Sequence, residues 1–185
     1  MIRKESQPLF AKINTLADLK KMMAGQGRGW PDAEILQANG LPLYTSATSP
    51  QLQKMLSAGR IDYLPLSILE VWPELQDPQE QQERLAGGIV VEPHLILHYP
   101  TAFYFFVQKE NQLLAATLEA GLRQAWQDGS ADKLFQRFYG SYIERAKIAE
   151  RTKIALRNPL LPAETPLEFL WTANGVSSVN AAAKK

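Results

Sequence analysis

The sequence contains no cysteine and only two histidines, and this scarcity excludes several kinds of chemistry. Without cysteine the chain has no disulfide, no zinc–thiolate site and no thiol nucleophile. It also lacks the short motifs of serine hydrolases, P-loop nucleotide-binding proteins and zinc-helix proteases. With 20 basic and 19 acidic residues, it has no charge excess that would attract nucleic acid or an anionic membrane. The residues therefore predict no enzyme, no cofactor and no nucleic-acid partner.

Long hydrophobic runs are also missing. The longest, "LILHYPTAFYFFV" at 95–107, is interrupted by His98 and Pro100 and is too short to span a membrane. The first residues, "MIRKESQPLF", lack the apolar stretch of a signal peptide. A chain of 185 residues with 45% hydrophobic composition is typical of one globular domain or of two small lobes.

The first part of the chain alternates between strand patterns and helix patterns. Strands are predicted at 22–27, 41–46 and 61–66. Helices are predicted from a capping box at Thr15 and Asp18, from Pro31, from Ser49–Pro50 and from a capping box at Ser67 and Glu70. This order is typical of a parallel α/β sheet, in which ligands bind beyond the carboxyl ends of the strands.

The second half predicts fewer strands and longer helices. Two strands are expected within 89–109, of which the second, "AFYFFV", is expected to be buried in a sheet because its apolar run is continuous. Asn111 opens the longest helix, and Asp128–Gly129 separates it from another. A helical face with paired charges is predicted over 144–153, followed by a proline-rich extended strap from Asn158.

Three segments in this order resemble the type II periplasmic solute-binding proteins, and among them family 3 of the extracellular solute-binding proteins. They are "LADLKKMMAGQGRGW", "LSAGRIDYLPLS" and "FYFFVQKENQLLAATLEAGLRQAWQDGSADKLFQRFYG". The resemblance covers roughly residues 10–145. It implies an α/β fold with one three-layer αβα lobe, plus C-terminal helices that return to a first lobe of which most is absent from this chain.

The same resemblance implies a division of the chain and a function. Residues 1–13 would form the first hinge strand and its lead-in, 14–98 the second lobe, 99–150 the second hinge and returning helices, and 151–185 an extended C-terminal tail. The implied function is reversible, non-enzymatic binding of a small polar or anionic solute, amino-acid-like or a carboxylate. The solute would be captured in the periplasm for the membrane permease of an ABC transporter. A sensory input domain and, less favoured, an enzyme on the same fold remain alternatives, and exposed helices at 111–145 would favour a homodimer.

The candidate ligand-binding residues lie on the turns at the carboxyl ends of the predicted strands. Arg28, Gly29 and Trp30 precede a helix, and a guanidinium beside a helix N-terminus suits a carboxylate. An ordinary tight turn with a solvated arginine would use the same residues. On the next turn Ser46 is a possible donor, although capping is the commoner use of such a hydroxyl.

The third turn adds Tyr63, Ser67 and Glu70. In amino-acid-binding members of the family, an aspartate near the end of this strand commonly holds the ligand's ammonium group, and the resemblance places that position at Ser67. Serine carries no charge, so capture of an α-amino acid by that route is in doubt. Glu70 lies one helical turn later and is a substitute, although a capping box explains it equally.

Glu92, His94 and His98 share one face of a predicted strand. On a straight strand the two histidines lie about 13 Å apart, which is too far for one metal ion. A half-exposed strand with polar residues outward is therefore preferred, and no metal site is predicted.

Overall fold

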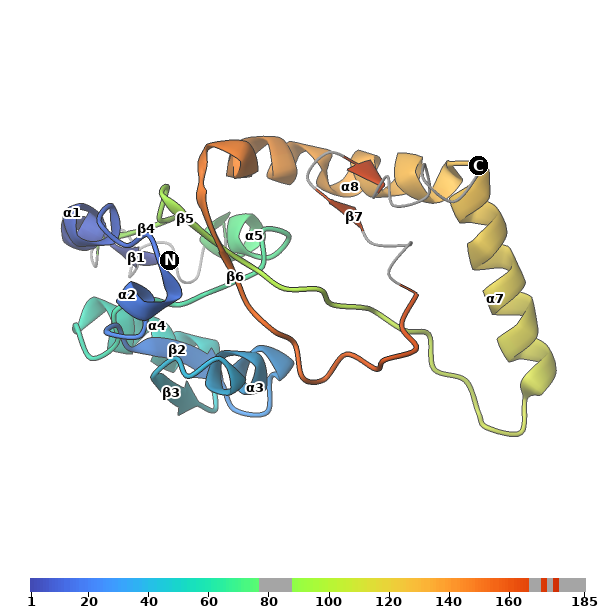
Figure 1. The fold of residues 1–185 in the computed structure, drawn as a ribbon, viewed down its shortest axis with the longest axis horizontal. Helices are drawn as coiled ribbons and strands as arrows, with labels where there is room; N and C mark the ends of the chain where they lie inside the picture. The colour runs from blue at the N-terminus through green and yellow to red at the C-terminus, as the bar shows by residue number, and fades with distance from the viewer. Residues whose placement is uncertain (77–87, 167–170, 173–174, 177–185) are drawn as a thin grey trace. The chain divides into compact units, whose positions relative to one another are not determined.

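The computed structural model describes residues 1–76, 88–166, 171–172 and 175–176, and the chain forms two compact units (Figure 1). Unit 1 contains Met1–Pro100 and Ala146–Leu160, and unit 2 contains Thr101–Arg145 and Leu161–Lys185. Within the described residues, none of the helices has the length and apolar character needed to cross a membrane. Helices and strands are mixed, as the predicted α/β class requires.

The sheet of unit 1 is built from two strand pairs joined by one residue. β2 (Ala24–Gly27) and β3 (Leu43–Ser46) are parallel, whereas β1 (Ile2–Arg3) and β4 (Ile89–Val90) are antiparallel. Tyr63 bridges to Ala24 on one side and to Ile2 on the other. The predicted strand at 61–66 is therefore reduced to a single bridge. Pro65 follows two residues later and has no N–H with which to extend the ladder.

α2 (Leu16–Leu19), α3 (Pro31–Ala38) and α4 (Ser49–Ser57) form where helices are predicted. The fourth helix, α5 (Val71–Gln76), begins four residues after the predicted cap at Ser67, because residues 68–70 form a turn. Ala24 packs in a hydrophobic cluster that contains Ile35 of α3. A Cβ added at the neighbouring Gly25 would lie 3.3 Å from a methyl group of Leu52 in α4. Because successive residues of a strand face opposite sides of a sheet, α3 and α4 cover opposite faces. The shorter η1 (Lys4–Ser6) and α1 (Gln7–Phe10) follow β1.

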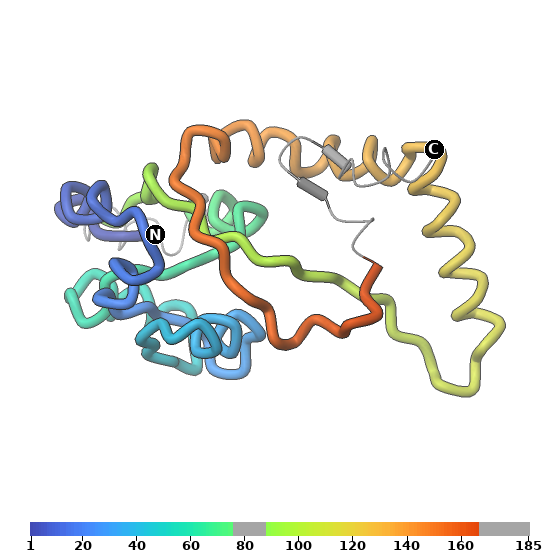
Figure 2. The backbone as a smooth tube through the Cα atoms, in the orientation of Figure 1, coloured from blue at the N-terminus to red at the C-terminus, as the bar shows by residue number. Residues whose placement is uncertain are grey.

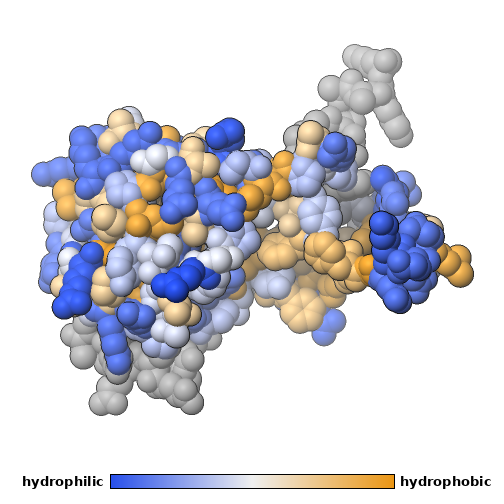
Figure 3. Space-filling view, turned by 90° about the horizontal axis from the view of Figure 1, so that it is seen from below, coloured by the Kyte–Doolittle hydropathy of each residue, from blue (hydrophilic) through white to orange (hydrophobic). Residues whose placement is uncertain are grey.

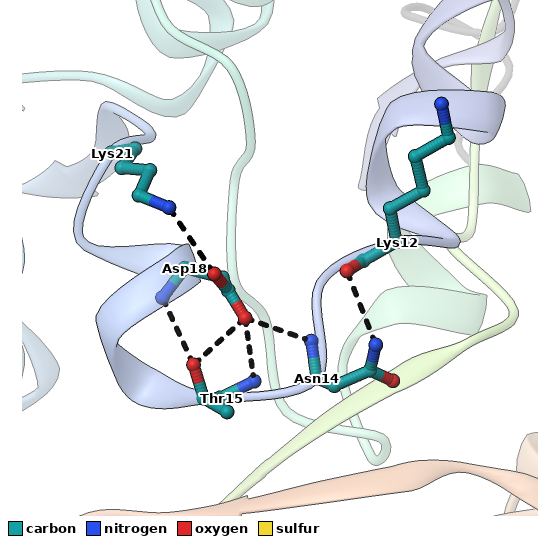
Figure 4. Close-up of polar contacts among 5 residues, drawn as sticks. All are labelled: Lys12, Asn14, Thr15, Asp18 and Lys21. Atoms are coloured by element: carbon teal, nitrogen blue, oxygen red, sulfur yellow. Dashed lines mark hydrogen bonds and ion pairs between the residues drawn. The ribbon is translucent and has the colours of Figure 1, made fainter.

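The predicted capping box of α2 is confirmed (Figure 4). The Thr15 hydroxyl oxygen accepts a hydrogen bond from the Asp18 N–H, and the Asp18 carboxylate accepts one from the Thr15 N–H. Hydrogen bonds from the Thr15 hydroxyl and from Lys21 lower the pKa of Asp18 below its ordinary value. Predicted helix ends are confirmed as well, since Gly40 and Gly59 take positive φ angles of 73° and 70° just beyond α3 and α4.

A second parallel pair lies in unit 1, formed by β5 (Leu95–His98) and β6 (Thr152–Ala155), which are far apart in sequence (Figure 2). The Arg151 guanidinium donates to the backbone oxygens of Ala146, Glu92 and Leu95. These bonds fix the start of β6 beside β5. The prediction of helix through Lys153 is therefore wrong, because α8 (Ser130–Ala146) ends earlier and is followed only by η2 (Ile148–Glu150).

Unit 2 contains α7 (Gln112–Gln127), all of α8 except its last residue, and a short antiparallel pair of β7 (Trp171–Thr172) and β8 (Gly175–Val176). The Asn111 side chain accepts a hydrogen bond from the Leu114 N–H, so the predicted start of α7 is confirmed. Gly129, with φ of 75°, separates the two helices as predicted. No residue of α7 is buried.

The prediction that "AFYFFV" is a buried strand is wrong. Residues 101–107 form neither helix nor strand, and the side chains of Phe103 and Phe106 are 94% and 92% exposed. A strand that is apolar on both faces needs neighbouring strands and a layer on each face. In the part of the chain that the structure describes, no strand pairs with this segment.

Candidate functional site

The turns that follow β2, β3 and the Tyr63 bridge surround a cavity of about 420 Å³ in unit 1. Its size falls within the range of small-molecule sites. The sequence predicted that these turns meet at one edge of the sheet, and one residue or more from each lines the cavity. The lining residues are Trp30, Pro31, Asp32, Ser49, Leu66, Glu70 and Glu74.

Trp30 forms an aromatic wall of the cavity because a glycine leaves room for its ring. Trp30 is the N-cap residue of α3 and is 39% exposed. A Cβ added at Gly27 would lie 2.2 Å from Cε2 of the indole, so the ring rests directly against the end of β2. Pro31 takes the first position of α3, as predicted. The fixed φ angle of proline suits this position, so the helix begins directly after Trp30.

Asp32 is held in place by a residue that lies far away in the sequence. The Tyr99 hydroxyl, just beyond β5, donates a hydrogen bond of 2.6 Å to Oδ1 of Asp32. Burial raises the pKa of Tyr99 above its ordinary value, and so do the hydrogen bond to Asp32 and the negative charges of Asp32 and Glu70. Tyr99 therefore stays a hydrogen-bond donor at neutral pH. Within the described residues, Oδ2 of Asp32 has no hydrogen-bond partner.

Two glutamates complete the acidic part of the lining. Oε1 of Glu74 in α5 accepts hydrogen bonds from Ser49 Oγ at 2.9 Å and from Gln53 Nε2 at 2.7 Å, which connects α5 to α4. Oε2 of Glu70 accepts from the Ser67 N–H at 3.2 Å. The Ser67 hydroxyl accepts from the N–H of residue 69 instead of residue 70, so only the carboxylate half of the predicted box is present.

The first two predicted turns supply fewer lining residues to the cavity than the sequence suggested. Arg28 and Gly29 are exposed and do not line the cavity, and Gly29 has a positive φ of 79°. Ser46 is 2% exposed, and its hydroxyl donates to the Gln51 side chain at 2.6 Å. This bond uses Ser46 to shape the turn before α4, in keeping with the structural alternative considered for it.

On the third turn, the structure places Tyr63 and Ser67 outside the lining. Tyr63 is 5% exposed, and its ring packs edge to face on Phe10 in the hydrophobic core. Burial raises the pKa of Tyr63, and its hydroxyl has no partner among the described residues. Of the predicted site residues, only Trp30 and Glu70 come together at the cavity.

Sequence reasoning missed Asp32, Glu74 and Tyr99 as residues of the site. Asp32 gives no signal of its own, because an acidic residue in the first turn of a helix is usual next to the helix dipole. Glu74 carries no local signal beyond its place in a helix. Tyr99 is 67 positions from Asp32, so no short motif could have paired them.

The residues considered for metal binding have other partners. The Glu92 carboxylate accepts hydrogen bonds from the backbone N–H groups of His94 and Leu95. His94 Nε2 lies 3.0 Å from the backbone oxygen of Ile13. Burial and the positive charge of Lys153 lower the pKa of His98. The described part of the chain brings together no group of three acidic or histidine side chains that fits a metal ion.

The charged side chains that line the cavity are therefore all acidic. Among the described residues, its lining contains three carboxylates and no basic side chain. The carboxylates are not grouped as metal ligands among the described residues, and an aromatic ring stands beside them. Such a lining suits an organic cation, which can use charge-assisted hydrogen bonds and an aromatic face together.

No protein-family model matches the sequence, and no curated protein matches it. Similar solved structures include an ancestral arginine-binding protein bound to glutamine, at 18% identity and a TM-score of 0.43, and bound to arginine, at 18% and 0.40. Both alignments cover 69% of this chain and 54% of that one. The YckB protein of Bacillus subtilis is similar at 21% identity and a TM-score of 0.46, over 84% of this chain and 59% of the other. The chain thus spans 54–59% of the length of these structures.

Proposed function

We propose that unit 1 reversibly binds a small solute that carries a positively charged amine or guanidinium group. The supporting observation is the cavity lined by Asp32, Glu70, Glu74 and Trp30, with no basic side chain from the part of the chain that the structure describes. This differs from the anionic solute that Arg28 and the helix N-terminus suggested. Three nearby carboxylates repel an anion and attract a cation.

Each lining residue has a defined part in this binding. Asp32 and Glu70 accept hydrogen bonds from the charged group of the solute, and Trp30 offers its ring face to the same cation. Tyr99 keeps Asp32 oriented through its hydroxyl. Binding needs no bond to be made or broken, so the solute is released unchanged.

The wider role is that of a capture protein for an ABC transporter. In this proposal the full protein lies in the periplasm, belongs to the type II solute-binding class, and delivers the solute to a membrane permease. The resemblance of the three sequence segments supports this role, and the placement of the cavity at the carboxyl ends of β2 and β3 is compatible with it.

Isothermal titration calorimetry with matched solutes tests the charge preference. Arginine and lysine should bind, whereas citrulline, which replaces the guanidinium of arginine by an uncharged urea group, should bind at least ten-fold more weakly. Succinate should show no binding. The recovered solutes should keep their mass after overnight incubation. Binding of succinate in preference to arginine would contradict the proposal.

Isosteric variants then locate the site. Asp32→Asn and Glu70→Gln should each weaken arginine binding by roughly 10- to 100-fold, because hydrogen bonds to charged groups contribute about 1.5–3 kcal/mol. Glu34→Gln is the matched control, since Glu34 is an exposed acid on the same helix as Asp32 and lies outside the lining. Equal losses in the control and in Asp32→Asn would place the binding site elsewhere.

A further inference from the structure

The segment Thr101–Val107 of unit 2, named here the pairing segment, has backbone groups without hydrogen bonds and aromatic side chains that are exposed. None of its backbone N–H or C=O groups forms a hydrogen bond with another described residue. Phe103, Phe105 and Phe106 are 94%, 70% and 92% exposed. Aromatic and β-branched residues of this kind favour a strand, and unpaired strands of this composition attach readily to another strand.

The helices of unit 2 add further exposed apolar surface. Leu113 of α7 is 81% exposed, and Leu134 and Phe138 of α8 are 56% and 61% exposed. In the space-filling view, hydrophobic residues stand uncovered at the surface on the side of the picture that holds unit 2 (Figure 3). α7 buries none of its residues and α8 buries only Ala146, so Leu113, Leu134 and Phe138 keep most of their side-chain surface exposed.

The exposed area matches the requirement of a stable dimer. Among the described residues of unit 2, four phenylalanines are exposed, and at roughly 200 Å² for each aromatic side chain they present on the order of 600 Å². The exposed leucines raise this toward the ~800 Å² that each partner contributes to a standard interface. Monomeric proteins seldom present more than about 300–600 Å² of continuous apolar surface.

The charge of this region permits contact between identical copies. Residues 101–145 contain five basic and five acidic side chains, so two copies carry no net charge that would repel them. The basic residues are Lys109, Arg123, Lys133, Arg137 and Arg145, and the acidic residues are Glu110, Glu119, Asp128, Asp132 and Glu144.

We infer that a second copy of this chain covers the surface, and that the pairing segments of the two copies form antiparallel strands about a two-fold axis. Two-fold symmetry places identical segments in opposite directions, which is the geometry of an antiparallel ladder. The ladder satisfies the free backbone groups, and facing aromatic side chains stabilise it across the strands. α7 and α8 of both copies then cover the aromatic residues. This inference does not depend on the proposed function of unit 1.

Sedimentation equilibrium of the 185-residue chain tests the inference. A dimer is expected at micromolar concentration, and the double variant Phe103→Ser with Phe106→Ser should weaken its Kd at least ten-fold. Leu9→Ser is the matched control, because Leu9 is a 51% exposed leucine in unit 1. Far-ultraviolet circular dichroism should show the same helix content in all three proteins.

A cross-link locates the contact. Since the chain has no cysteine, Tyr104→Cys places a single thiol at the centre of the pairing segment, and mild oxidation should give a covalent dimer. Ser57→Cys, an exposed position in unit 1, should remain uncross-linked. The inference fails if the chain stays monomeric at 100 µM in this assay, which would assign the surface to a different protein. It also fails if the dimer is insensitive to the two phenylalanine substitutions, or if the copies form open-ended oligomers.

Discussion

Replacing Gly27 by alanine should displace Trp30 from the cavity wall without removing it. The added Cβ would lie 2.2–2.6 Å from three atoms of the indole ring. Since non-bonded carbon atoms pack at about 3.5–4.0 Å, the ring must move by more than about 1 Å. Trp30 is 39% exposed, so solvent is available for this movement and the fold should persist.

The loss of affinity follows from the contact that the ring makes with a cation. A cation over an indole contributes about 0.5–2 kcal/mol, so Gly27→Ala should weaken arginine binding by roughly 2- to 30-fold. Trp30→Ala removes the same contact and should cause a similar loss. Adding Gly27→Ala to Trp30→Ala should then have almost no further effect, because both changes act on one interaction.

Calorimetry and urea denaturation together separate this effect from misfolding. Gly25→Ala is the control on the same strand, since its Cβ would lie 2.4 Å from Cδ1 of Ile61, which is buried. It should lower the free energy of unfolding by about 1–3 kcal/mol through overpacking and leave Trp30 in position. The reasoning is refuted if Gly27→Ala binds arginine normally while Trp30→Ala does not.

Three further predictions concern stability and the acidic site. Leu52→Ala should lower the free energy of unfolding by about 2–5 kcal/mol in urea denaturation, because Leu52 is fully buried. Tyr99→Phe should weaken arginine binding, with little additional loss in the Asp32→Asn background if Tyr99 acts through Asp32. In an isolated chain of residues 1–185, burial lowers the pKa of the Met1 amino group from 8.0 to about 5. The unfolded chain therefore takes up this proton first, and the free energy of unfolding should fall by up to about 4 kcal/mol as pH falls from 8 to 5. N-terminal acetylation should abolish that part of the pH dependence, and an unchanged slope would contradict the assignment.

Most features that depend on nearby residues agree with their prediction, although the box at Ser67 and Glu70 is only half formed. The capping box at Thr15, the proline at the start of α3 and the asparagine at the start of α7 act within four positions along the chain. The alternation of short strands and helices also gave the parallel pairing of β2 with β3 and the edge at which the turns meet. These signals are local because backbone dihedral angles and helix-end hydrogen bonds are local.

Burial and long-range pairing were not predictable in the same way. "AFYFFV" has the composition of a core strand, and it stays exposed because no described strand lies beside it. The helical face predicted over 144–153 overlaps the first two residues of β6. The pairing of β6 with β5 depends on Arg151, which contacts backbone oxygens more than 50 positions away. Local patterns carry no information about such partners.

The amino-acid sequence alone determined the ends of α3 and α4, the capping box of α2, and the edge of the sheet at which the turns after β2 and β3 meet. Only the tertiary structure decided the charge of the cavity at that edge, because Asp32, Glu70 and Glu74 reach it from separate helices and turns, while Arg28 is not among its described lining residues. The physical reason is that the preference of a cavity depends on which side chains converge in space. That convergence is set by packing between residues tens of positions apart.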